Sequence, residues 1–186
     1  MYKKKEHSDG YWHARLSLAF IPIAAVIGAA AIFIPLAWWE RLSLSALGCL
    51  MGIVLPPDLD QDSWVTATRI WFRIPLVGWI IGYAYSFYFY PYAYNFKHRG
   101  ISHHPVWGTL TRIGYILIWT PIFLSLLKLG VLVYLQDSIS LTSLAAVFSG
   151  WFLIVLGNIW QGVCLAIGVY ASDISHVLRD KRGWQI

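Results

Sequence analysis

The feature that most limits how this chain can fold is a series of apolar stretches separated by short polar segments. Three long stretches cover 16–39, 113–135 and 141–170, and a shorter one covers 42–55. A helix of about 20 apolar residues crosses a bilayer, so the long stretches qualify as spans, whereas the shorter one needs its neighbours to shield it. The pattern therefore predicts an all-α, polytopic membrane protein with about four transmembrane helices.

The composition supports this class of protein. Hydrophobic residues make up 58% of the 186 residues and charged residues only 12%, about half the charged share of a typical soluble domain. A domain of this length cannot bury so much apolar surface in its own core, so the excess must face lipid or a partner. We therefore expect a single helical domain over 1–186, surrounded by membrane lipid.

The segment 75–96 is rich in Tyr, Trp and Phe and contains Pro91. Tyr and Trp favour the membrane–water interface, because the ring stays in the apolar region while the polar atom reaches water. We interpret this segment as an interfacial or re-entrant helix. Its length would also allow a transmembrane span, and the sequence leaves that alternative open.

Basic residues indicate the orientation in the membrane. Two helical hairpins would bring the start of the first span, the end of the second, the start of the third and the end of the fourth to one side. Of the 14 Lys and Arg residues, only Arg41 and Lys128 lie away from that side. Because basic residues are enriched on the cytoplasmic side, we expect this side to be cytoplasmic, in a bacterial inner membrane. Lipid headgroups then account for the net charge of +5, and no nucleic-acid partner is expected.

His and Asp residues gather at the same helix ends. Asp58 and Asp60 follow two prolines, and in an extended segment their carboxylates point to the same side. His98 and His103 flank Gly100, which permits a sharp turn that aims both imidazoles inward. Each motif also has a simpler interpretation, since the first is typical of a helix stop and the second of a basic loop at the headgroups.

A third group lies near the end of the chain. Asp173, His176 and Asp180 are spaced so that they share one face of a helix. This spacing suits a metal-binding His with neighbouring carboxylates. The alternative is a solvated helix end, where Asp180 pairs with Arg179 or Lys181.

Ionisable groups close to bilayer segments are unfavourable unless they pair or bind a cation, so the combined set indicates a metal site. Imidazole and carboxylate together suit Zn, Mn or Fe as the divalent metal ion. The chain contains no H-E-x-x-H motif, no nucleotide-binding G-x-x-x-x-G-K-[ST] loop and no G-x-S-x-G turn for a serine nucleophile. The metal ligands predicted from these motifs are Asp58, Asp60, His98, His103, His176 and Asp180.

The order of these motifs resembles that of a known family. The shared elements are His13, P-D-L-D at 57–60, H-R-G-I-S-H at 98–103 and S-H-V-L-R-D at 175–180, with Gly108, Thr109, Arg112 and Tyr115 as an extended pattern. The chain is similar to uncharacterised metal-binding membrane proteins related to the LexA-binding, inner-membrane-associated metal-dependent hydrolases. The resemblance implies a helical membrane protein with a divalent-metal site, and it adds His13 to the predicted metal ligands. It also implies hydrolase chemistry.

We favour a metal-dependent hydrolase that acts on phosphoesters. The candidate catalytic residues are Arg99, which would bind an anionic group bidentately, and Asp173 and His104, each as a base or as a support for the ligands. The alternative is a non-catalytic structural or scaffold protein in which the metal holds the helix ends together. Metal transport is the least favoured function, because the spans carry almost no candidate ligands near the middle of the bilayer.

Overall fold

The computed structural model describes residues 9–56, 71–96, 104–135 and 140–183, and over these ranges every regular element is a helix. The helices are α1 (Asp9–Ala30), α2 (Trp38–Val54), α4 (Gly78–Asn95), α5 (Pro105–Tyr134), α6 (Leu141–Gly157) and α7 (Ile159–Gly183). The all-α class predicted from the sequence is thus confirmed for the described residues.

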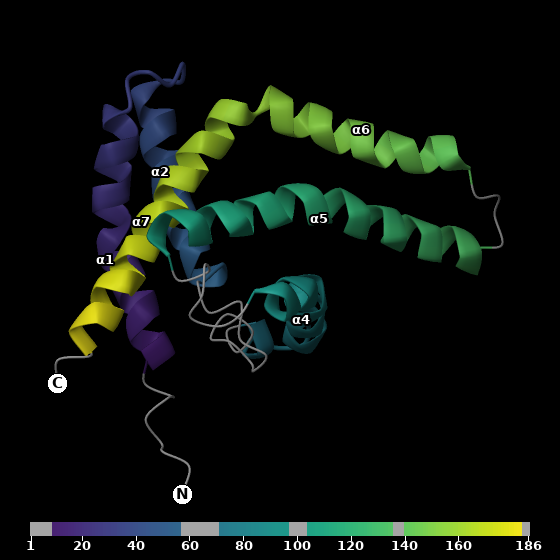
Figure 1. The fold of residues 1–186 in the computed structure, drawn as a ribbon, viewed down its shortest axis with the longest axis horizontal. Helices are drawn as coiled ribbons and strands as arrows, with labels where there is room; N and C mark the ends of the chain where they lie inside the picture. The colour runs from purple at the N-terminus through teal and green to yellow at the C-terminus, as the bar shows by residue number, and fades with distance from the viewer. Residues whose placement is uncertain (1–8, 57–70, 97–103, 136–139, 184–186) are drawn as a thin grey trace, which may run out of the picture.

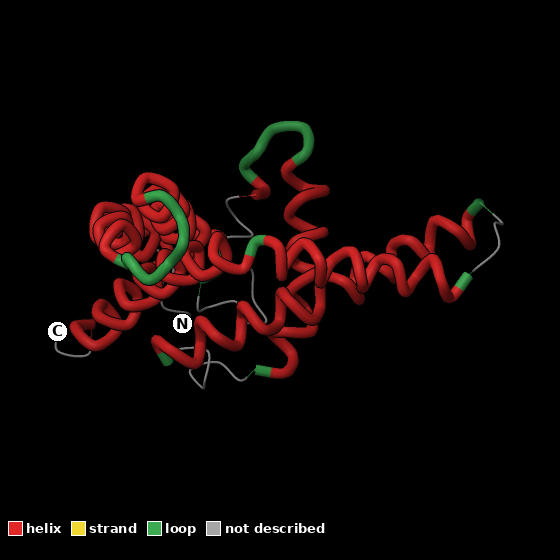
Figure 2. The backbone as a smooth tube through the Cα atoms, turned by 90° about the horizontal axis from the view of Figure 1, so that it is seen from above, coloured by secondary structure: helices red, strands yellow, loops and turns green. Residues whose placement is uncertain are grey.

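Helices from both ends of the chain form a bundle. α1, α2 and α7 pack side by side, whereas α5 and α6 form an antiparallel hairpin that extends away from the bundle, crosswise to α1 and α2 (Figures 1 and 2). α4 packs against α5 through aromatic rings, including those of Tyr88 and Phe123. α1 begins and α7 ends at the same end of the bundle, and α2 ends and α5 begins beside α7 (Figure 1). Helix ends that are far apart in the sequence therefore lie close together.

Small residues allow the bundle to pack tightly. A Cβ atom on Gly48 of α2 would lie 2.1 Å from the carbonyl oxygen of Leu165 in α7, and one on Gly168 would lie 2.0 Å from the carbonyl oxygen of Ser45. Only glycine permits the two backbones to approach so closely. The packing of α2 against α7 is therefore a direct consequence of these two glycines.

The first apolar stretch forms a helix that ends earlier than predicted. α1 stops at Ala30, and residues 31–37 form a turn instead of continuing the span. The buried guanidinium of Arg41 donates hydrogen bonds to the carbonyl oxygens of Ala29 at 3.0 Å and Ile34 at 3.1 Å. These bonds satisfy carbonyl groups that have no helical partner at the helix end, which stabilises the turn.

The last apolar stretch also differs from the prediction. The pattern predicts one helix over 141–170, whereas the structure contains α6 and α7, bent by 76° at a break around Asn158. The side-chain amide of Asn158 donates a hydrogen bond to the carbonyl oxygen of Ile154 at 2.8 Å. A side chain that bonds to the nearby backbone in this way competes with helix continuation, which explains the position of the break.

By length and composition, one described helix can cross a membrane, Val106–Tyr134, or two if α6 and α7 are counted as one bent span. α1 contributes a shorter apolar helix, Ala14–Ala30. The arrangement with four crossings and the single domain over 1–186 therefore stay predictions. For the aromatic segment, the helical form is confirmed by α4, and its interfacial position stays a prediction.

Candidate functional site

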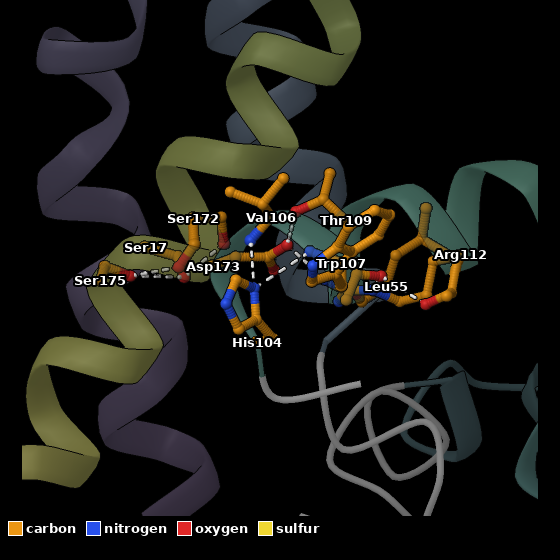
Figure 3. Close-up of polar contacts among 12 residues, drawn as sticks. Ser17, Leu55, His104, Val106, Trp107, Thr109, Arg112, Ser172, Asp173 and Ser175 are labelled. Atoms are coloured by element: carbon orange, nitrogen blue, oxygen red, sulfur yellow. Dashed lines mark hydrogen bonds and ion pairs between the residues drawn. The ribbon is translucent and has the colours of Figure 1, made fainter. Parts of the chain in front are cut away.

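A buried arginine connects three of the helices that meet beside the bundle. Arg112 lies two turns into α5 and is 1% exposed. Its Nε donates to the carbonyl oxygen of Gly108 at 3.1 Å and its Nη1 to that of Leu55 at 2.5 Å (Figure 3). Its Nη2 forms an ion pair with Oδ2 of Asp173. One guanidinium thus joins α5 to the end of α2 and to α7.

Asp173 accepts hydrogen bonds from two side chains of α5. Its carboxylate is buried, and Oδ2 accepts from Nη2 of Arg112 and from the hydroxyl of Thr109. Thr109 and Arg112 are three residues apart, so they lie on the same face of α5. A carboxylate this deeply buried needs such partners, because an uncompensated buried charge is strongly destabilising. The pairing fixes α5 against α7 at this point.

The end of α2 depends on side chains from other helices. Pro56 and the proline after it have no backbone N–H, so they cannot satisfy the last carbonyl groups of the helix. The carbonyl oxygen of Val54 accepts instead from the phenol of Tyr85 in α4, and that of Leu55 accepts from Arg112. These bonds anchor the position at which the chain leaves α2 toward the P-D-L-D motif.

His104 caps the start of α5, where Pro105 occupies the first helical position. Its Nδ1 accepts hydrogen bonds from the backbone N–H groups of Val106 and Trp107, both at 3.3 Å (Figure 3). Because Nδ1 is the acceptor in these bonds, a neutral imidazole carries its proton on Nε2. The side chain is exposed.

Hydroxyl groups connect α1 to α7 close to Asp173 along the helix. The Oγ atom of Ser17 lies 2.8 Å from that of Ser172 and 3.5 Å from that of Ser175, and all three serines are buried (Figure 3). His176 follows Ser175 on α7 and is 4% exposed. The polar face of α7 is therefore packed against α1 as well as against α5.

The structure describes three of the predicted site residues with their side chains, namely His104, Asp173 and His176. Asp173 and His176 lie one turn apart on α7, as their spacing predicts. His13 and Asp180 belong to α1 and α7, although nothing is described of their side chains. The remaining predicted residues lie outside the described ranges, and they are Asp58, Asp60, His98, Arg99 and His103.

Metal ligation by these residues stays a prediction. Within the described ranges, no group of three or more His, Cys, Asp or Glu side chains is placed to hold a metal ion. The donor types nevertheless fit one, because imidazole and carboxylate groups are the usual ligands of Zn, Mn and Fe in proteins.

A protein-family model described as an uncharacterized metal-binding protein matches residues 8–185. The chain belongs to this family. The description of this metal-binding family supports metal binding and names neither the metal nor a reaction. The predicted relationship to the LexA-binding hydrolases is not tested by this match. No curated protein and no solved structure matches the chain.

In this member of the metal-binding family, sequence reasoning missed the link between Arg112 and Asp173. The sequence marks Arg112 only through the extended family pattern, and it gives no indication of Tyr85 or Ser17. A usable signal exists for Arg112, since an arginine inside an apolar helix needs an acidic or carbonyl partner. Tyr85 and Ser17 carry no comparable signal, because Tyr and Ser also occur elsewhere in the apolar segments.

Proposed function

We propose that this chain is a membrane-embedded, metal-dependent hydrolase of phosphoesters, with a site of His and Asp residues at the cytoplasmic face. The observation that carries the proposal is the meeting of α2, α5 and α7 at Arg112. Each of these helices adjoins a predicted ligand motif. In the sequence, Asp58 follows the end of α2, His103 precedes the start of α5, and His176 lies one turn beyond the ion pair on α7.

The donors at these helix ends fit a divalent metal. His176 is buried one turn from a carboxylate, and such neighbours commonly orient an imidazole that ligates a metal. When bound, a Zn, Mn or Fe ion polarises a phosphoryl oxygen and activates a water molecule for hydrolysis. The residues proposed to hold it are His13, Asp58, Asp60, His98, His103, His176 and Asp180.

Other residues of the chain have separate roles in this proposal. Arg99 binds the anionic phosphate through its planar guanidinium. His104 donates a hydrogen bond from Nε2 to a substrate oxygen, because its Nδ1 is already engaged by the N-terminus of α5. Asp173 supports the site through Oδ2, which accepts from Arg112 and Thr109, and its second oxygen, Oδ1, is the candidate base.

The α5–α6 hairpin supports membrane embedding. α5 is long and apolar enough to cross a bilayer, and none of the residues of α6 is buried. Large apolar side chains such as Val131 in α5 and Leu153 in α6 are 56% and 70% exposed. Each Å² of apolar surface left in water is unfavourable by about 25 cal/mol, whereas lipid removes this cost. Lipid is therefore the proposed surrounding of the hairpin, and the basic residues direct the motif side to the cytoplasm.

A non-catalytic structural role is the second candidate. It is favoured by the observation that the polar side chains described near the motifs bond to the protein itself. Arg112 contacts two carbonyl groups and a carboxylate, and His104 contacts two backbone N–H groups. In such a protein the metal would hold the helix ends together with no open coordination position.

Phosphate release separates the two candidates. The detergent-purified chain would be stripped of metal with a chelator, reloaded with Zn, Mn or Fe, and assayed against an aryl phosphate and phosphatidate. The hydrolase proposal predicts metal-dependent release that Arg99→Ala and His176→Ala abolish and the control variant His7→Ala retains. Metal binding without release from either substrate would favour the structural role.

A further inference from the structure

We propose that Arg112 is a positioning residue for the metal site, which sets the ends of α2 and α5 relative to the polar face of α7. The inference rests on the proposed metal binding. It goes further by assigning the geometry of the site to a residue that does not itself ligate the metal.

The first step is the distribution of the three bonds of Arg112. Its nitrogen atoms have separate acceptors in α5, at the end of α2 and on α7. A guanidinium is planar and rigid, so it holds its acceptors in one relative arrangement. A shift of α2 or α5 along α7 would break at least one of these bonds.

The second step is that the ion pair fixes the relative position of the helices more than it stabilises the fold. Burying two opposite charges removes both from water, and apolar side chains of similar size often stabilise a fold equally well. The bundle already has close backbone packing at Gly48 and Gly168, which joins α2 to α7. α5 is joined to α7 by the bonds from Arg112 and Thr109 to Asp173, which are directional.

The chain contains a matched control for this role. Arg41 is also buried and also donates to two backbone carbonyl groups, but it does so at the turn between α1 and α2. This turn lies at the end of the bundle opposite the start of α1 and the end of α7 (Figure 1), and no predicted ligand motif adjoins it. Lysine keeps the charge of arginine and loses its planar fork. Arg112→Lys and Arg41→Lys therefore make the same chemical change at two different places.

The test compares these two variants in the full chain purified in detergent. Hydrogen exchange of the metal-free protein reports on the last turn of α2 and the first turn of α5, and titration with Zn or Mn against a competing chelator reports metal affinity. We expect Arg112→Lys to accelerate exchange at both turns and to weaken metal affinity about 10- to 100-fold, the usual range for residues that orient ligands. Arg41→Lys should retain the wild-type affinity.

The outcomes that would overturn the inference can be told apart from a failure of the proposed function. Wild-type metal affinity in Arg112→Lys would overturn the inference and leave the proposed function intact. An equal loss of metal affinity in Arg112→Lys and Arg41→Lys would also overturn the inference, because it would indicate general destabilisation. A wild-type chain that binds none of these ions would refute the proposed function and the inference with it. If Arg112→Lys does not fold, Thr109→Val removes one donor to Asp173 and should weaken affinity, whereas the control Thr111→Val should not.

Discussion

Replacing Asp173 with alanine would leave the guanidinium of Arg112 buried without its carboxylate. Arg112 is 1% exposed, so water does not readily replace the lost partner. An uncompensated buried charge of this kind costs about 3–5 kcal/mol. Thr109 loses its acceptor as well, which adds about 1 kcal/mol. We therefore expect Asp173→Ala to lower the free energy of unfolding by about 4–6 kcal/mol.

A double-mutant cycle tests whether the two charges act together. Arg112→Met alone leaves the Asp173 carboxylate buried with one donor fewer and removes the donor to the carbonyl oxygen of Leu55. Both single variants lose the same ion pair. The double variant should therefore lose about 2–3 kcal/mol less free energy of unfolding than the sum of the losses in the two single variants. The assay is reversible unfolding in sodium dodecyl sulphate, followed by circular dichroism. A loss below about 1 kcal/mol for Asp173→Ala, or additive losses, would refute the reasoning.

Three further predictions concern other parts of the chain. Gly48→Ala should lower the free energy of unfolding by about 1–3 kcal/mol, because its Cβ would lie 2.1 Å from the carbonyl oxygen of Leu165. In the control variant Gly150→Ala, the new Cβ atom meets nothing within 4 Å, so the change should be neutral or should stabilise the fold by up to about 1 kcal/mol. Equal effects of the two variants in thermal unfolding would contradict the close packing at Gly48. His104→Ala should lower the free energy of unfolding by about 1 kcal/mol through loss of the helix cap, whereas His104→Asn should retain most of the stability. Equal stabilities of the two variants in the same unfolding assay would contradict the capping role. Because both native cysteines are buried, single cysteines introduced as Asp62→Cys and Ser138→Cys can be labelled selectively in cells. Asp62→Cys should react from the cytoplasm and Ser138→Cys from the periplasm, and labelling of both from one side would contradict the proposed orientation.

Local signals in the sequence account for much of the helical architecture. The two prolines after Leu55 end α2, and Pro105 begins α5, as expected from the missing N–H and the fixed backbone of proline. The turn at 31–37 contains Pro35, which is a signal of the same kind. Apolar residues nevertheless continue on both sides of this turn and of the bend at Asn158, so the hydropathy pattern alone predicts one continuous segment at each place. A run of apolar residues indicates where a segment is buried or meets lipid, but it does not show that the helix axis continues.

The candidate site, too, is predictable from the sequence only in part. The spacing of Asp173 and His176 predicts that they share a helix face, since that depends only on helical periodicity. The partner of Asp173 does not follow from spacing, because Arg112 is 61 residues away in the chain and the two meet only when α5 packs on α7. Motif order indicates which segments belong to the site, whereas the bonds that hold them depend on tertiary packing.

The central claim is that this chain binds a divalent metal through its His and Asp motifs, and elemental analysis of the purified protein tests it most directly. Wild type would be measured beside Asp58→Ala and His103→Ala, with Asp137→Ala, in the connection between α5 and α6, as the control. The account predicts about one or two equivalents of Zn, Mn or Fe in the wild type and the control, and their loss in the other two variants. A wild type that stays metal-free after reconstitution, or motif variants that keep the wild-type metal content, would contradict it.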